Sequence, residues 1–249
     1  MERYSRNRIY VSDEEQRKVQ QTRILLGGAG IGSIIAECAL RFGFEKITII
    51  DGDKVDLSNL NRQNYIRTDI GKYKAETLCK RLKKINPNAK VSFINSYFDH
   101  ENIHDIIHGY DIAVNALDFK NDIPFLFDKL CSEQNTPVLH PYNFGWAGFL
   151  TVIKPDGCKI TELSKEPQGF ELTMANYVAN HYAFWHHKDL WLKDIIYKYT
   201  HEKENLPPPQ LSIASWLVAG LSVNVMYNIA TGKEIIYFPK YYLSSIMND

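Results

Sequence analysis

Glycines recur in the turn Gly27-Gly28-Ala29-Gly30-Ile31-Gly32, which separates a short apolar segment from an apolar helical pattern. A glycine turn between a strand and a helix lets backbone N–H groups approach phosphate oxygens at the positive end of the helix. Ala29 replaces the middle glycine of a GxGxxG motif, and such a turn can also serve packing alone. Because this turn follows the first expected strand, Gly28, Gly30 and Gly32 are candidate cofactor-binding positions.

Asp51, in Asp51-Gly52-Asp53, ends the β-branched segment that follows, at the distance of about 20 residues seen in dinucleotide-binding folds. An acidic side chain there can accept hydrogen bonds from both ribose hydroxyls. Asp-Gly-Asp is also ordinary turn chemistry. Taken alone, the glycines and Asp51 would indicate NAD.

The loop Ser58-Asn59-Leu60-Asn61-Arg62-Gln63 changes this interpretation, because a dehydrogenase is not expected to carry amides and an arginine directly after the acidic segment. Gly71-Lys72-Tyr73-Lys74 and Asn115-Ala116-Leu117-Asp118 follow, and Arg3-Tyr4-Ser5-Arg6 precedes all of them. In this order, the motifs resemble those of the ThiF/MoeB family, the bacterial relatives of ubiquitin-activating enzymes. The resemblance covers residues 3–155 well and 209–232 more loosely.

The resemblance implies an adenylyltransferase that uses ATP and Mg²⁺. The C-terminal carboxylate of a small ubiquitin-like or sulfur-carrier protein, or of a peptide, would attack the α-phosphate, and pyrophosphate would leave. This step mainly requires that phosphate charge be neutralised. Arg62 and Lys74 would be the catalytic cations, and Asp118 the carboxylate on the Mg²⁺ side.

The family also supplies an arginine from the partner protomer, and Arg6 would fill that role in a homodimer. The residues expected to bind the nucleotide are Gly28, Gly30, Gly32, Asp51, Asp53, Asn59, Arg62, Lys74 and Leu117. Considered singly, Arg6 or Lys74 would more often be a surface cation, and Asp118 an ordinary loop acid. Their order in the chain is what assigns them these roles.

The cysteines depart from the family pattern. Cys38, Cys79, Cys131 and Cys158 form no CxxC pair, so we expect neither a disulfide framework nor the two-pair zinc site of many family members. Dispersed cysteines are typical of the reducing cytoplasm. None follows Cys158, so a thioester at the usual place is not expected. We interpret Cys158 as inert, and the alternative is a nucleophile on a mobile loop.

A second departure concerns the family's Asp-Asn pair, which is Asp118-Phe119 here. The contact of that asparagine is therefore lost or has moved to Asn121.

Strand patterns alternate with helical patterns over the first part of the chain, which predicts an α/β fold: a Rossmann-like, mostly parallel sheet flanked by helices, with a C-terminal helical and strand extension. The expected strands are 23–26, 47–50, 91–94, 112–115, 138–141 and 149–153, and the expected helices are 31–42, 71–85, 104–108 and 125–131. Residues 3–21 are expected to form an arm or a short helix.

Three parts are expected: an ATP-binding adenylation core over 1–155, a crossover and aromatic helical segment over 156–208, and a last part over 209–249. This last part is expected to contain a helix and then a strand near 235–243, and to complete the same domain as the core. Residues 158–208 match no known pattern. They are interpreted either as a partner-binding lid or as a packed helical excursion, and acceptor specificity is expected to lie there.

Charge and hydropathy limit the possible partners. Lys plus Arg and Asp plus Glu number 29 each, so the net charge of zero argues against broad binding of nucleic acid or an anionic membrane. The uncharged segment 211–230 is long enough to span a bilayer. It also contains five polar side chains, so we interpret it as a helix buried in protein: Ser212, Ser215, Ser222, Asn224 and Asn228.

Three other functions stay open. The loop around Asn59 also resembles that of tRNA threonylcarbamoyladenosine dehydratases, although the neutral charge argues against a tRNA substrate. A non-catalytic, nucleotide-binding dimeric scaffold is the second, and the retained Arg62, Lys74 and Asp118 speak against it. An NAD-linked enzyme is the third.

Overall fold

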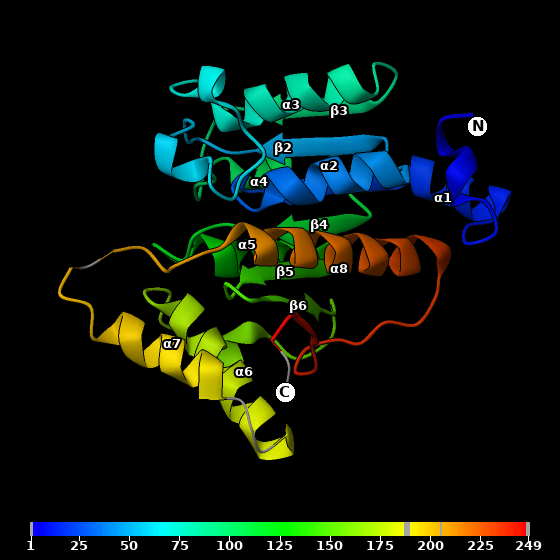
Figure 1. The fold of residues 1–249 in the computed structure, drawn as a ribbon. Helices are drawn as coiled ribbons and strands as arrows, with labels where there is room; N and C mark the ends of the chain where they lie inside the picture. The colour runs from blue at the N-terminus through cyan, green and yellow to red at the C-terminus, as the bar shows by residue number, and fades with distance from the viewer. Residues whose placement is uncertain (1, 187–189, 205, 248–249) are drawn as a thin grey trace.

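The computed structural model describes residues 2–186, 190–204 and 206–247, with side chains described outside 182–190. Its centre is a seven-stranded sheet with the strand order β3-β2-β1-β4-β5-β6-β7 (Figure 1). β1 to β5 are parallel: Arg23–Gly27, Lys46–Ile50, Lys90–Ile94, Ile112–Asn115 and Val138–Asn143. β6 (Ala147–Ile153) pairs antiparallel with β5, and β7 (Tyr242–Ser245) pairs antiparallel with β6. The predicted mostly parallel sheet is confirmed, and the carboxyl ends of its parallel strands share one edge.

Helices cover both faces of the sheet. α2 (Gly32–Phe42), α3 (Lys74–Ile85) and α8 (Ser212–Thr231) pack on one face, and α1 (Asp13–Gln21) contacts α8. α4 (Ile103–Ile106), α5 (Ile123–Glu133) and α6 (Phe170–His186) pack on the other, and α7 (Leu190–Thr200) lies against α6. Short 3₁₀ turns occur at Glu2–Asn7, Leu57–Asn59, Arg67–Asp69 and Ile160–Glu162.

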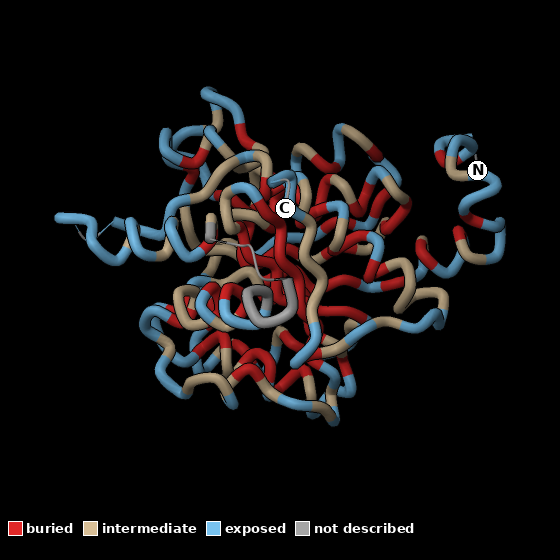
Figure 2. Tube along the Cα trace, turned by 60° about the horizontal axis from the view of Figure 1, so that its bottom comes forward, coloured by how far each residue is buried: buried red, intermediate tan, exposed pale blue. Residues whose placement is uncertain are grey.

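Alternation along the strands produces two apolar layers. Ile24 and Leu26 of β1 join the cluster under α2, α3 and α8, whereas Leu25 joins the cluster under α4, α5 and α6. Successive strand side chains point to opposite faces, so a strand covered on both faces has to be apolar throughout. Figure 2 shows these strands buried at the centre, with exposed residues on the surrounding loops and helices.

α8 is the one helix of the described chain that length and composition would allow to cross a membrane, with a mean hydropathy of 1.4. Here it lies on β5 and β6 and contacts α2 (Figure 1). A Cβ on Gly148 of β6 would come within 2.6 Å of the Val218 nitrogen in α8, so helix and strand approach closely. The structure therefore packs this segment as a core helix.

Two expected elements were placed wrongly. The helix expected from Gly71 begins at Lys74, because Gly71 has a φ of +83° and Tyr73 is extended. The strand expected over 235–243 is confined to Tyr242–Ser245. Before it, the chain runs as a loop in which Pro239 has no N–H to donate to a ladder, while Ile235 and Tyr237 still pack on the core.

The aromatic segment 171–199 forms two helices, α6 and α7, and residues 187–189 between them lie outside the described residues. The N-terminal segment 3–21 forms a 3₁₀ turn followed by α1.

Candidate active site

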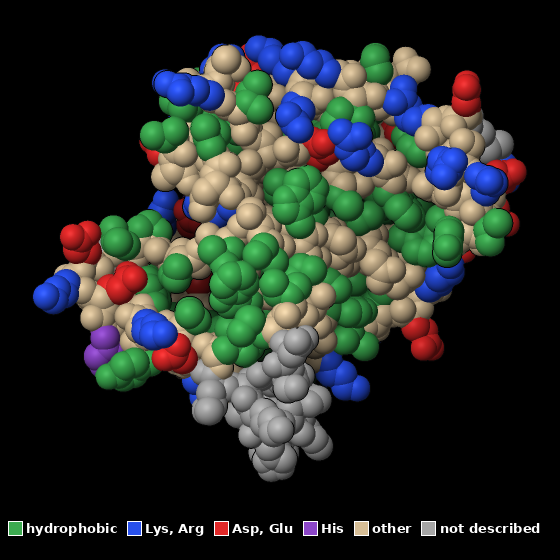
Figure 3. Space-filling view, viewed as in Figure 1, with side chains coloured by type: hydrophobic (Ala, Val, Ile, Leu, Met, Phe, Trp, Pro, Cys, Tyr) green, Lys and Arg blue, Asp and Glu red, His purple; other side chains and the backbone are tan. Residues whose placement is uncertain are grey.

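A cavity of about 760 Å³ opens where the carboxyl ends of the parallel strands meet. Loops after β1, β2, β3, β4 and β5 line it, together with α6, α7 and the segment that leads into α8. The space-filling view shows the molecule hollowed on this side (left in Figure 3). Open parallel sheets commonly bind ligands at this edge.

The glycine turn after β1 forms one wall. Gly28 has a φ of +91°, and a Cβ there would lie 2.3 Å from the Ala116 carbonyl oxygen. A Cβ on Gly30 would approach Gln63 Nε2 to 3.3 Å. Both glycines line the cavity, so the turn keeps its backbone open to a ligand.

Gly32 was expected to bind the nucleotide, but it lies away from the cavity lining. It does not line the cavity, and a Cβ there would meet the Leu26 side chain at 3.0 Å. Its small size allows α2 to approach β1, which is a packing role. The prediction that Gly32 contacts the nucleotide is not supported by this position.

Asp51 connects the glycine turn to the loop after β2. Its Oδ2 accepts a hydrogen bond from the Ala29 N–H at 2.6 Å, and its Oδ1 accepts one from the Asp53 N–H at 2.7 Å. Burial raises the pKa of the Asp51 carboxyl, although these two hydrogen bonds and Lys74 oppose the shift. Asp51 therefore organises the loops, and it also lines the cavity.

Asp53 and Lys74 form an ion pair, and both residues line the cavity. Lys74 Nζ lies 3.0 Å from Asp53 Oδ2, and the Lys74 side chain is only 8% exposed. The Tyr97 hydroxyl donates to Asp53 Oδ1 at 2.6 Å. Burial would raise the pKa of Asp53, but Tyr97 and Lys74 outweigh it and the pKa lies below its usual value. The same hydrogen bond raises the pKa of Tyr97 to about 12.

Arg62 lines the cavity from the loop after β2. Its Nε donates to Gln210 Oε1 at 2.5 Å, and its Nη1 donates to Ser58 O and Asn61 Oδ1 at 2.9 and 2.8 Å. Burial lowers the pKa of Arg62, and Asp118 opposes this shift. Nη2 has no hydrogen-bond partner among the described residues, so one edge of the guanidinium is available to an anion.

Asn59 is buried beside Arg62. Its Oδ1 accepts from the Asp56 N–H at 3.0 Å, which caps the short turn Leu57–Asn59. Both Asn59 and Arg62 line the cavity. The polar loop that distinguished this sequence from a dehydrogenase thus lies on the cavity wall.

Leu117 and Asp118 come from the loop after β4, and both line the cavity. Asp118 is exposed and pairs with Lys120 at 3.1 Å, an interaction that raises the pKa of Lys120. Among the described residues, no three His, Cys, Asp or Glu side chains group as a metal cage. One exposed carboxylate still suits Mg²⁺, because that ion commonly keeps waters and is held largely by substrate phosphates.

Arg6 lies far from this cavity within its own chain. Its neighbour Tyr4 donates to Glu45 Oε1, just before β2 begins, and Arg3 donates to the Ile85 carbonyl at the end of α3. The N-terminal segment is therefore at the opposite end of the sheet from the cavity (right in Figure 1). Arg6 is exposed there, and a single chain does not bring it to the site.

The four cysteines also lie outside the cavity. Cys79 and Cys131 are buried and Cys38 partly so, and burial raises the pKa of all three thiols. Cys158 is exposed in the turn that follows β6.

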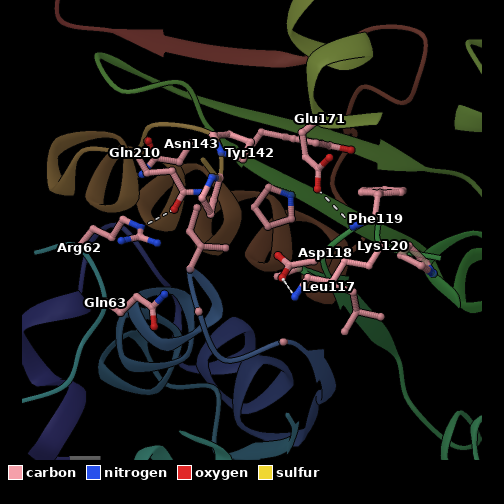
Figure 4. Close-up of a pocket in the computed structure, with 18 of the residues that line it drawn as sticks. Arg62, Gln63, Leu117, Asp118, Phe119, Lys120, Tyr142, Asn143, Glu171 and Gln210 are labelled. Carbon is pink, nitrogen blue, oxygen red and sulfur yellow. Dashed lines mark hydrogen bonds and ion pairs between the residues drawn. The ribbon is translucent and has the colours of Figure 1, made fainter. Parts of the chain in front are cut away.

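Sequence reasoning missed many of the lining residues, among them Tyr142, Asn143, Glu171 and Gln210. Figure 4 shows Arg62 and Gln63 on one side of the cavity, and Phe119, Lys120 and Glu171 on the other. Asn143 Nδ2 donates to Leu211 O at 2.7 Å and to Ser215 Oγ at 3.0 Å, so it fixes the start of α8. The end of the strand at Asn143 and the Pro-rich approach to Gln210 were signals that could have been used. Glu171 lies in a segment without a known pattern.

The glycine turn, the acidic strand end, the Arg-bearing loop and the Asp118 loop thus surround one cavity at the carboxyl ends of a Rossmann-like sheet, which is the usual place of a nucleotide site in this fold. The ThiF family model matches residues 4–248, so the chain belongs to the ThiF family. The predicted family is confirmed.

Named relatives match about two thirds of the chain. A SAMP-activating enzyme E1 from Haloferax volcanii is 29% identical over 163 residues, which are 63% of this chain and 59% of that protein. A tRNA threonylcarbamoyladenosine dehydratase from Haemophilus influenzae is 35% identical over 163 residues, 65% of this chain and 60% of that protein. The matches thus span about three fifths of these relatives.

The fold also resembles that of E. coli MccB, solved with AMPCPP and MccA. The TM-score is 0.70 at 20% identity, and the match covers 98% of this chain and 70% of MccB. At this identity the likeness concerns the fold.

The close approach at Gly28 leads to a stability prediction. Gly28→Ala should lower the free energy of unfolding by at least about 2 kcal/mol, since it combines backbone strain with a clash that the Ala116 carbonyl cannot relieve cheaply. Gly169→Ala is the matched control: its φ is +76°, but nothing lies within 4 Å of the added Cβ. Denaturant unfolding of both variants measures the difference. Equal losses for the two variants would contradict the assignment of a steric role to Gly28.

Proposed function

We propose that the chain adenylates a carboxylate with ATP, and that this carboxylate is the C-terminus of a peptide or of a small ubiquitin-like or sulfur-carrier protein. The observation that carries the proposal is the arrangement of two cations, Arg62 and Lys74, around a glycine turn in a cavity with room beside it for a second substrate. The E1 name of one relative and the ATP analogue in the MccB structure support the same class.

Each residue has a part in the proposed step. The glycine turn holds the phosphates, and Asp51 accepts the ribose hydroxyls. An acceptor carboxylate oxygen forms a bond to the α-phosphorus while the bond to the β-phosphate oxygen breaks, and pyrophosphate leaves. Arg62 Nη2 and Lys74 Nζ neutralise the charge that builds up on the phosphates.

Nucleotide binding would change the partners of Lys74. Its ammonium is held by Asp53 in this structure, and the buried position makes it a strong electrostatic partner for a phosphate. Tyr97 also holds Asp53, so the carboxylate stays hydrogen-bonded when Lys74 turns to the nucleotide.

We place Mg²⁺ on the Asp118 side of the triphosphate. The ion would supply further charge neutralisation when bound. The lone exposed carboxylate of Asp118 fits an ion that the phosphates largely hold.

The product would be the acyl-adenylate itself, without a thioester on this chain. No cysteine lines the cavity, and the chain has none after Cys158. We also propose a cytoplasmic location, which the free cysteines favour.

A second candidate is activation of a carboxylate on modified tRNA. It is favoured by the 35% identity to a tRNA threonylcarbamoyladenosine dehydratase. The zero net charge opposes it, because RNA affinity depends on cations that contact phosphates. Affinity for tRNA that is weak even at low salt, with a shallow salt dependence, supports the peptide or protein acceptor, whereas tight binding that falls steeply with salt supports the tRNA.

Arg6 enters the proposal through a homodimer. It is exposed at the end of the sheet opposite its own cavity, so only another protomer could present it to the triphosphate. A guanidinium supplied in this way would stabilise the charge of the transition state.

Acceptor-dependent exchange of labelled pyrophosphate into ATP tests the activity. Arg62→Ala and Lys74→Ala should each lower kcat/KM by about 10²–10³-fold, because each removes a cation from the transition state. The exposed neighbours Arg67→Ala and Lys72→Ala are the controls and should retain exchange. If exchange stays at the wild-type rate in both Arg62→Ala and Lys74→Ala, the activity would belong to a contaminating protein. The chain would then be better explained as a non-catalytic scaffold.

Mixing two inactive variants tests the dimer. Arg6→Ala and Lys74→Ala are each expected to be inactive, but an equal mixture re-equilibrated into dimers should recover about a quarter of the wild-type exchange. Half of the dimers are then mixed, and each has one intact site. Arg8→Ala, another exposed arginine nearby, should keep activity alone. A mixture no more active than its components would contradict a site shared between protomers.

A further inference from the structure

The cavity has two chemically different halves. The loops after β1, β2 and β3 supply glycines, Asp51, Asp53 and Lys74, and they form the half suited to a nucleotide. The other half lies beside β5, which neighbours β4 on the side away from β1. The Asp118 loop, after β4, lies between the two halves, so a group in the second half would lie next to the phosphates of a nucleotide bound in the first.

The second half is mostly apolar. α6 and α7 contribute Leu172, Ala175, Leu192, Ile195, Ile196 and Tyr199 to its lining. Among the described residues of α6 and α7 that line the cavity, only Glu171 carries a charge. An apolar chamber of this kind accommodates a side chain rather than a triphosphate, since it offers phosphate oxygens few partners.

Glu171 points into this chamber beside the reaction centre. Its Oε1 accepts the backbone N–H of Phe119 at 3.2 Å, one residue from Asp118 (Figure 4). Oε2 has no hydrogen-bond partner among the described residues. A carboxylate in mostly apolar surroundings gains most from an N–H donor brought by a ligand.

Tyr142 provides a second polar atom in the same half. It is only 7% exposed and lines the cavity, and its hydroxyl has no hydrogen-bond partner in the described structure. Burial raises the pKa of Tyr142 well above its usual value, with contributions from Asp128 and Glu171, so its hydroxyl stays protonated. An unpaired buried hydroxyl is costly unless a ligand completes its hydrogen bond.

Charge also sets the direction in which an acceptor can bind. Its reacting carboxylate would be repelled by Glu171 and attracted by Arg62 and Lys74. An acceptor therefore fits with the carboxylate toward the phosphates and with a donor group toward Glu171. A terminal glycine has no side chain to make that second contact.

We infer that Glu171 and Tyr142 form a specificity subsite for the last residue of the acceptor, and that this residue carries a side chain with an N–H donor. The inference rests on the proposed adenylation and specifies the acceptor for that same site. Amide and ammonium side chains share the required chemistry.

Exchange of labelled pyrophosphate with pools of short random peptides tests the subsite. Each pool has one fixed C-terminal residue: Asn, Gln or Lys as donors, and Leu, Asp or Gly as non-donors. The wild-type protein should show kcat/KM values about 10–100-fold higher with at least one donor pool than with Leu. The Asn, Gln and Lys pools distinguish an amide from an ammonium.

Two substitutions assign the preference to these residues. Glu171→Gln keeps an oxygen for the Phe119 N–H but removes the charge, so it should reduce the donor-to-Leu ratio by about tenfold or more. Tyr142→Phe should reduce the ratio less, because it removes a neutral hydroxyl. The controls are Glu166→Gln and Tyr197→Phe, both exposed and outside the cavity lining. They should leave the ratio unchanged.

The outcomes separate the subsite from the proposed function. Equal exchange with donor, Leu and Gly pools overturns the subsite while leaving adenylation intact. The subsite is also overturned if Glu171→Gln lowers exchange with all pools equally and changes the KM for ATP as well, because that pattern indicates a structural role. Exchange with no pool and no carrier protein, although ATP binds, would overturn the proposed function and the subsite with it.

Discussion

The carboxylate of Asp51 is the contact on which the rest of the cavity depends. It accepts the N–H groups of Ala29 and Asp53, so it fixes the glycine turn after β1 against the loop after β2. Burying this carboxylate is unfavourable, which is why its pKa is raised, and the two backbone hydrogen bonds offset that cost. Once these loops are fixed, Asp53 can hold Lys74 and Tyr97, and Gly28 can approach the loop after β4.

At the carboxyl ends of the strands, the charged and the apolar lining residues occupy different parts of the cavity. Cations and backbone donors gather over β1 and β2, whereas α6 and α7 bring apolar side chains and Glu171 over β5. The contacts of Gln210 with Arg62 and of Asn143 with Leu211 hold the start of α8 across the two halves. A helix that packs deep in the core thus also helps to position a cation of the site.

Local patterns predicted much of this arrangement. Periodicity predicted the parallel strands. The order of the motifs, which resembles that of the ThiF family, predicted the lining positions of Asp51, Asn59, Arg62, Lys74 and Asp118. Gly32 was expected to bind the nucleotide but does not line the cavity, and motif spacing does not distinguish a glycine that faces a ligand from one that packs against Leu26. Glu171 and Tyr142 could not be predicted, since the packing of α6 against the sheet brings them to the cavity from outside any motif. The strand expected near 235–243 failed because its apolar residues pack on the core from a loop.

Isotope transfer from the acceptor tests the central claim most directly. An acceptor peptide or protein with a heavy oxygen isotope in its C-terminal carboxylate would be incubated with ATP and the chain, and the acyl-adenylate then cleaved with hydroxylamine. Attack at the α-phosphate predicts one heavy oxygen in the AMP released, together with pyrophosphate. ADP as the product, or heavy oxygen in inorganic phosphate with none in AMP, would contradict the account.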